Sequence, residues 1–84
     1  MDSFGNHIKE ARIIKYLSKS ELARRVGITP QYITDIETDR VIPNEKKIEK
    51  LIEILDLNEI DTFKKADKIP IKIYEQAKRD YYKQ

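Results

Sequence analysis

The stretch SKSELARRVGITPQYITDIE, residues 18–37, decides the fold of this chain. Its first half predicts a helix that begins after Ser18, because Ser18 and Glu21 have the spacing of a capping box. Gly27 then supplies the left-handed position at which helices commonly end. Pro30 opens a second helix, since the N–H that proline lacks has no partner at a first helical position. The stretch therefore predicts two short helices separated by a very short turn.

Two helices joined by a turn of three residues must cross steeply, which predicts a helix-turn-helix over residues 19–38. Ala23 provides the small side chain that such a crossing needs at its closest approach, and Thr29 provides the cap of the second helix. The apolar side chains expected to face the crossing are Leu22, Val26, Ile33 and Ile36.

Outside this motif, apolar residues also recur at helical spacing. The pattern predicts a helix over about residues 4–16, one that follows an Asn44 cap, and a short one that follows Asn58. Pro70 can begin a further helix over about 71–82, with a short strand at 69–74 as the alternative. The expected fold is an all-α bundle of five or six helices, with a core over 1–57 and a C-terminal segment over 58–84.

Composition narrows the possible functions. The 84 residues include no cysteine, and their net charge is only +2. Disulfides and thiolate metal sites are therefore excluded, and a cytoplasmic protein is expected. No apolar run approaches the about 18 residues that cross a membrane. His7 is the only histidine and is expected on a helix surface, and the sequence contains no glycine-rich phosphate loop, so we expect neither an enzyme nor a cofactor.

The sequence resembles the phage repressor/Cro-like (XRE) family of helix-turn-helix DNA-binding domains. The resemblance covers about residues 4–57 and rests on IKEAR (8–12), LSKSELARRVGITPQYITDIE (17–37) and VIPNEKKIEKLIEILDL (41–57). It implies that the second helix of the motif lies in the DNA major groove. The chain is then expected to be a sequence-specific transcriptional regulator, a repressor that binds an operator as a homodimer.

The resemblance implies five positions that face the bases: Thr29, Gln31, Tyr32, Thr34 and Asp35. Gln31 can pair with adenine through two hydrogen bonds, and Tyr32 and the Thr34 methyl group can touch a thymine methyl. Asp35 can accept a hydrogen bond from cytosine, or it can pair with a nearby arginine. The alternative for the whole set is an ordinary solvated helix face.

By the same resemblance, the DNA backbone is contacted by Lys19, Arg40 and Asn44. Surface solubility is the alternative role of the two basic residues. Arg12 and Glu37 match an ion pair that ties the first helix of the domain to the end of the base-reading helix. Asp39 and Tyr16 stand where the family often has glycine, so an acid lies next to Arg40 and the exit from the first helix is expected to differ.

The segment over 58–84 carries more apolar surface than a free tail needs. It can complete the core of one protomer, dock another protein, or form a dimer interface. The residues expected at a dimer interface are Ile60, Phe63, Ile71, Tyr74 and Tyr81. The alternative function is accordingly an antitoxin or another module that uses this fold to bind a partner protein.

Overall fold

The computed structural model describes residues 2–82, and every regular element in that range is a helix. The order is α1 (Phe4–Ile14), α2 (Lys19–Val26), α3 (Pro30–Glu37), α4 (Glu45–Leu55), α5 (Glu59–Lys65) and α6 (Ile71–Tyr82). The prediction of an all-α fold is confirmed. The alternative strand at 69–74 is wrong, since α6 begins within it. No helix in the described range is long and apolar enough to cross a membrane.

The predicted caps are in place. The Ser18 hydroxyl accepts from the backbone N–H of Glu21, and the Glu21 carboxylate accepts from that of Ser18, which completes the capping box. Gly27 ends α2 in the left-handed conformation, with φ of 86°. The side chains of Thr29, Asn44 and Asn58 cap α3, α4 and α5.

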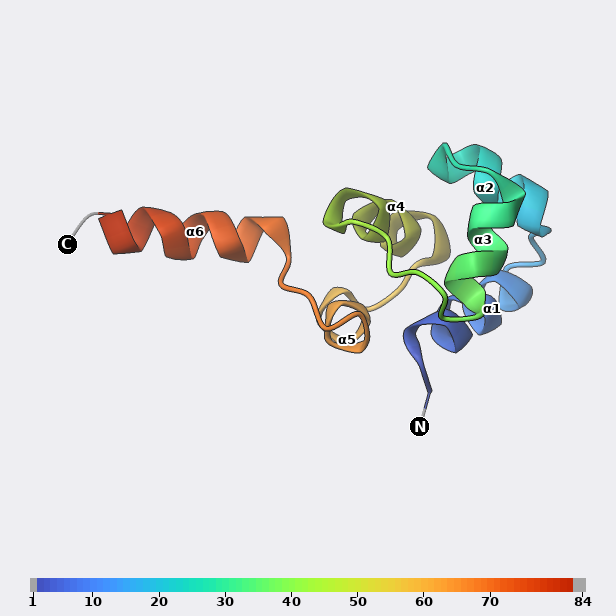
Figure 1. The fold of residues 1–84 in the computed structure, drawn as a ribbon, viewed down its shortest axis with the longest axis horizontal. Coiled ribbons are helices and arrows are strands. Elements are labelled where there is room, and N and C mark those ends of the chain that lie inside the picture. The colour runs from blue at the N-terminus through green and yellow to red at the C-terminus, as the bar shows by residue number, and fades with distance from the viewer. Residues whose placement is uncertain (1, 83–84) are drawn as a thin grey trace.

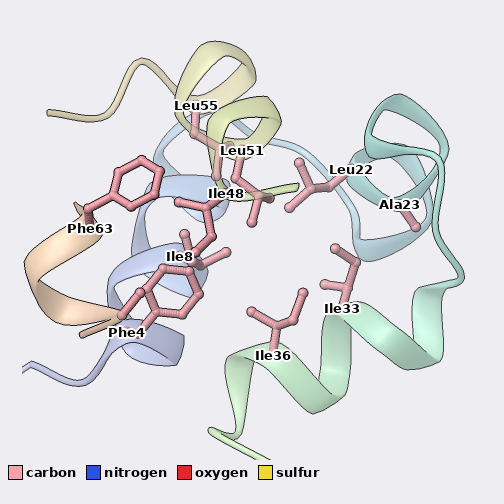
Figure 2. Packing of buried hydrophobic residues seen from close by; sticks show 11 residues of the cluster. Phe4, Ile8, Leu22, Ala23, Ile33, Ile36, Ile48, Leu51, Leu55 and Phe63 are labelled. Carbon is pink, nitrogen blue, oxygen red and sulfur yellow. The ribbon is translucent and has the colours of Figure 1, made fainter. Parts of the chain in front are cut away.

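The core gathers apolar side chains from α1 to α5 (Figure 2). Leu22 and Ala23 of α2 and Ile33 and Ile36 of α3 are buried there, so the steep crossing is packed as predicted. Val26 packs only against the edge of the cluster. The remaining buried apolar side chains are Phe4, Ile8, Ile48, Leu51, Leu55, Phe63 and Ala66.

Tyr16 and Asp39 both take the backbone conformation that glycine would take, with φ of 57° and 62°. This conformation is disfavoured for side chains with a Cβ atom, although aspartate tolerates it better than most residues. Helix α1 ends at Ile14, two residues before the predicted end, and Tyr16 turns the chain toward α2 with its side chain almost fully exposed. Both residues therefore adopt a left-handed backbone conformation that glycine would adopt without strain.

The beginning of α1 lies directly against the end of α3 (Figure 1). A Cβ atom at Gly5 would lie within 3.0 Å of the carbonyl oxygens of Ile36 and Glu37 and of the Asp39 carboxylate. In the space left by the missing side chain, the Gly5 N–H donates to Asp39 Oδ1 at 2.8 Å. Asp39 thus binds the positive end of α1.

Helix α5 and helix α6 differ in how they relate to the core. Phe63 of α5 is only 1% exposed, which corrects the expectation that it lies in a dimer interface: it packs inside its own protomer. No described residue of α6 is buried, and this helix extends away from the other five (Figure 1).

Candidate nucleic-acid interface

The outer face of α3 is polar and carries little charge. Gln31 is exposed, and Thr34 and Asp35 are half-buried. Tyr32 is also half-buried because its ring packs against the core, so part of this side chain supports the helix. Thr29 precedes the helix, and its hydroxyl accepts from the Tyr32 N–H at 3.1 Å. The five predicted base-facing residues therefore lie in one short segment, and Gln31 is the most accessible member of the helix itself.

Hydrogen bonds join these side chains to one another and to α2. Gln31 Nε2 donates to Asp35 Oδ1 at 3.1 Å, one helical turn further on. Lys19 Nζ, at the start of α2, donates to the Thr34 hydroxyl at 3.2 Å, and that hydroxyl in turn donates to the Pro30 carbonyl oxygen at 3.4 Å. Asp35 is paired with Gln31, and not with an arginine.

Two of the three predicted backbone-contact residues lie at the N-terminal ends of helices, and Arg40 lies in the loop between α3 and α4. Lys19 is the first residue of α2, where the exposed N–H groups already favour an anion. The Asn44 side chain accepts from the Lys47 N–H at 2.9 Å, so it caps α4. Arg40 has an exposed side chain, and its backbone N–H donates to the Asp35 carbonyl at 2.9 Å. The carboxylate of Asp39, the acid next to Arg40, accepts a hydrogen bond from the Gly5 N–H.

The predicted ion pair beneath α3 is present. Arg12 Nε lies 2.7 Å from Glu37 Oε2, and a second nitrogen of Arg12 donates to Oε1 at 3.1 Å. A third bond runs from Arg12 to the Leu17 carbonyl at 2.9 Å. The two side chains are 11% and 3% exposed, so the pair is almost fully removed from water. It fixes α1 to the C-terminal end of α3.

Sequence reasoning missed the role of His7. This residue is half-buried, and its Nε2 lies 3.0 Å from the Thr62 hydroxyl of α5. Burial lowers the pKa of His7 below 6.5, and the nearby Lys65 lowers it further. The pair links residues 55 positions apart, which no local pattern indicates.

No group of three His, Cys, Asp or Glu side chains that could hold a metal ion occurs within residues 2–82. The features that remain are a steep helix pair, an exposed polar face on its second helix, and basic or N–H-rich helix ends beside it. They define a helix-turn-helix protein. The sequence model of the helix-turn-helix family matches residues 8–61, more than half of the chain, and the chain belongs to this family. Its helix-turn-helix is of the phage repressor/Cro-like (XRE) class of DNA-binding domains.

Two relatives are similar to more than half of this chain. The ImmF control region 10 kDa protein of Bacillus phage phi105 is 32% identical over 54 residues, which are 64% of this chain and 60% of that protein. Multiprotein-bridging factor 1 of Candida albicans (strain SC5314) is 43% identical over 49 residues, 58% of this chain and 32% of that protein. The chain thus spans less than two thirds of the length of either relative.

A solved structure extends the similarity to almost the whole chain. The SinR protein/SinI protein complex contains a chain that matches with a TM-score of 0.63 and 27% sequence identity. The match covers 94% of this chain and 78% of that chain, so it includes most of the C-terminal segment as well as the helix-turn-helix.

Proposed function

We propose that this protein binds a specific operator sequence as a homodimeric repressor, with α3 of each protomer in the major groove. The observation that carries the proposal is the exposed polar face at the beginning of α3. Only three residues separate α3 from α2, and the core holds the two helices rigidly. A face of amide, hydroxyl and phenol groups suits the reading of base edges, because the phosphates are contacted by other residues.

In this proposal the segment that faces the bases comprises Thr29, Gln31, Tyr32, Thr34 and Asp35, and Gln31 is the principal reading residue. Its amide can donate to adenine N7 while it accepts from adenine N6. The hydroxyl of Thr34 is bound by Lys19, which leaves its methyl group to contact a thymine methyl. The exposed part of Tyr32 can do the same.

Three further residues position the protein on the duplex. Lys19 and Arg40 supply positive charge before and after α3 in the chain. Asn44 caps the N-terminal end of α4, whose remaining free N–H groups can bind a phosphate. These contacts carry no sequence information, and they make binding dependent on salt concentration.

The homodimer is proposed to form through α6 and the adjoining face of α5. Exposed apolar side chains are concentrated there, including Ile60, Ile69, Ile73, Tyr74 and Tyr81. A mainly apolar groove of about 290 Å³ between α5 and the start of α6 is lined by Ile60, Ile69 and Ile73. The α6 helix of a second copy, with Ile71, Tyr74 and Tyr81, offers an apolar surface of the kind that would cover this groove. Such an interface lies away from α3 and leaves it free to enter the groove of the DNA.

Selection of bound sequences from random duplex DNA tests the whole proposal. We expect a two-fold-symmetric motif whose half-sites are about one helical turn apart, since that spacing presents two recognition helices to one side of the duplex. Failure to enrich any motif would exclude sequence-specific binding, and a single unrepeated half-site would exclude the symmetric dimer.

The role of Gln31 is tested by Gln31→Ala. The variant should lose about 1–3 kcal/mol of specific binding free energy, with relaxed preference at one base pair per half-site and unchanged non-specific affinity. Gln76→Ala is the matched control, because it removes the same side chain from α6, on the side opposite Tyr74. An equal fall in specific and non-specific binding would exclude Gln31 as a base reader.

The role of the C-terminal helix is tested by deletion of residues 70–84. No residue of α6 is buried, and Pro70 is the only buried residue among the described ones that the deletion removes, so the shortened protein should remain folded and helical. We expect it to sediment as a monomer and to bind a full operator much more weakly than the complete chain. A shortened protein that still dimerises would place the interface elsewhere.

The alternative function is that of an antitoxin or another module in which the C-terminal segment binds a partner protein. The similar solved structure supports this alternative, because it is a complex of two different proteins and its match extends over 94% of this chain. Sedimentation of the purified chain separates the alternatives. A stable homodimer supports the first proposal, whereas a monomer that binds another protein through residues 58–84 supports the second.

A further inference from the structure

The hydrogen bond between Gln31 and Asp35 determines which donor and acceptor of the Gln31 amide remain free to meet a base. Gln31 Nε2 lies 3.1 Å from Asp35 Oδ1 on the exposed side of α3. We propose that Asp35 is a positioning residue which fixes the orientation of the Gln31 amide, and so restricts this position to adenine. The inference rests on the proposed role of α3 as the base-reading helix.

The orientation of the amide follows from donor and acceptor capacity. An ionised carboxylate can only accept hydrogen bonds, so the amide must turn its NH2 group, and not its oxygen, toward Asp35. One N–H of Gln31 is used in that bond. The second N–H and the carbonyl oxygen remain available, in a fixed relative arrangement.

The remaining groups of Gln31 match one base. Adenine presents an acceptor at N7 and a donor at N6 in the major groove, which complement an N–H and a carbonyl oxygen. Guanine presents acceptors at both N7 and O6, so the fixed carbonyl oxygen would face another oxygen. A freely rotating glutamine escapes this conflict by turning its NH2 group toward guanine. Asp35 prevents that rotation, because the turned amide would place its own oxygen against the carboxylate.

The same pairing occurs elsewhere in the chain. Gln76 Nε2 donates to Asp80 Oδ1 at 3.0 Å on α6, also across one helical turn. The bond is therefore a general property of a glutamine followed four residues later by an aspartate on a helix. The feature particular to α3 is its place at the exposed N-terminal part of the recognition helix, while the Lys19–Thr34 bond holds the adjacent turn of that helix.

The test compares sequence preference among the 84-residue chain and three variants: Asp35→Ala, Asp35→Asn and Asp80→Ala. The original chain should prefer adenine over guanine at the Gln31 position by about 5- to 150-fold, the range of one good bidentate pair. Asp35→Ala should retain binding but lose most of that preference. Asp35→Asn introduces an amide that can donate as well as accept, so it no longer fixes the Gln31 amide and should also lose most of the preference. Asp80→Ala should change nothing at this position.

Two outcomes would overturn the inference. If Asp35→Ala keeps the adenine preference and instead relaxes a C·G pair elsewhere, Asp35 reads cytosine directly. If all base preferences fall by the same factor, Asp35 acts on the fold of α3 and not on Gln31.

The bond itself can be measured without DNA. In the free protein, the side-chain amide protons of Gln31 should change their NMR chemical shift on Asp35→Ala, as those of Gln76 should on Asp80→Ala. Unchanged Gln31 shifts would refute the positioning role. Changed shifts in a protein that selects no DNA motif would instead show that the bond exists and that the proposed function has failed.

Discussion

Removal of Arg12 tests how much of the stability depends on the ion pair beneath α3. In Arg12→Met the Glu37 carboxylate, only 3% exposed, loses both of its bonds to the guanidinium. An uncompensated buried charge of this kind costs about 3–5 kcal/mol. The Leu17 carbonyl also loses its donor, which adds about 1 kcal/mol.

This loss of stability is large relative to the total free energy of unfolding of the protein. A domain of this size has a total stability of about 5–15 kcal/mol, so the variant should lose about a quarter of it or more. Since 1 kcal/mol corresponds to about 4–8 °C in Tm for a domain of 60–100 residues, Tm should fall by at least about 16 °C. Urea unfolding followed by circular dichroism measures the loss directly, provided that the slope against urea concentration is unchanged.

A double variant separates charge burial from loss of packing. Arg12→Met with Glu37→Met removes both charges and keeps similar side-chain volumes, so it should recover most of the stability and remain about 1 kcal/mol below the original. Lys15→Met is the control, because Lys15 pairs with Asp56 at an exposed site, where ion pairs contribute at most about 1 kcal/mol. The reasoning is refuted if Arg12→Met is as stable as the original, or if the double variant is no more stable than the single one.

Three further tests address the DNA contacts, the backbone and the histidine. Lys19→Ala and Arg40→Ala should each weaken binding to all DNA sequences, and each should reduce the slope of log K against log salt by about 0.9 for each phosphate that a protomer no longer binds. A variant with an unchanged slope would show that the substituted residue does not bind a phosphate. Gly5→Ala should prevent α1 from packing, since the new Cβ would meet backbone oxygens, whereas a Cβ at Gly27 has open space and Gly27→Ala costs only the strain of φ +86°. Chemical denaturation should therefore show Gly5→Ala to be the less stable variant, and equal losses of stability would contradict the close approach at Gly5. Because the pKa of His7 is lowered in the folded protein, the unfolded chain binds a proton at a higher pH than the folded one, so the contribution of His7 to stability should be complete above pH 6.5 and fall as the pH drops from there toward the lowered pKa. His7→Gln should remove this part of the pH dependence, and a variant with the same stability-versus-pH profile as the original protein would show that His7 has no such effect.

The sequence by itself determined the elements and the motif. The capping box at Ser18, the glycine at the end of α2 and Pro30 at the start of α3 are local signals, because each one acts on backbone groups within a few residues. The steep crossing followed from the three-residue turn and from Ala23. The structure confirmed these features and the all-α fold.

The resemblance to a known family was needed for the candidate site. Composition and periodicity indicate where α3 lies, but they do not distinguish a base-reading face from any other solvated helix face. The bond between Gln31 and Asp35 spans one helical turn and could have been expected from spacing. Spacing could not show that Asp35 would bond to Gln31 and not to a nearby arginine, since this depends on where the arginines lie in space.

Only the tertiary structure decided the contacts between distant segments. Asp39 lies next to Arg40 in the sequence, but its carboxylate binds Gly5, 34 positions away, because α1 begins where α3 ends. Phe63 was expected at a dimer interface, yet α5 carries it into the core. An apolar stripe shows only that a helix face needs a partner. Which surface becomes that partner depends on the path of the entire chain, and this is why α5 places Thr62 and Phe63 in the core while no residue of α6 is buried.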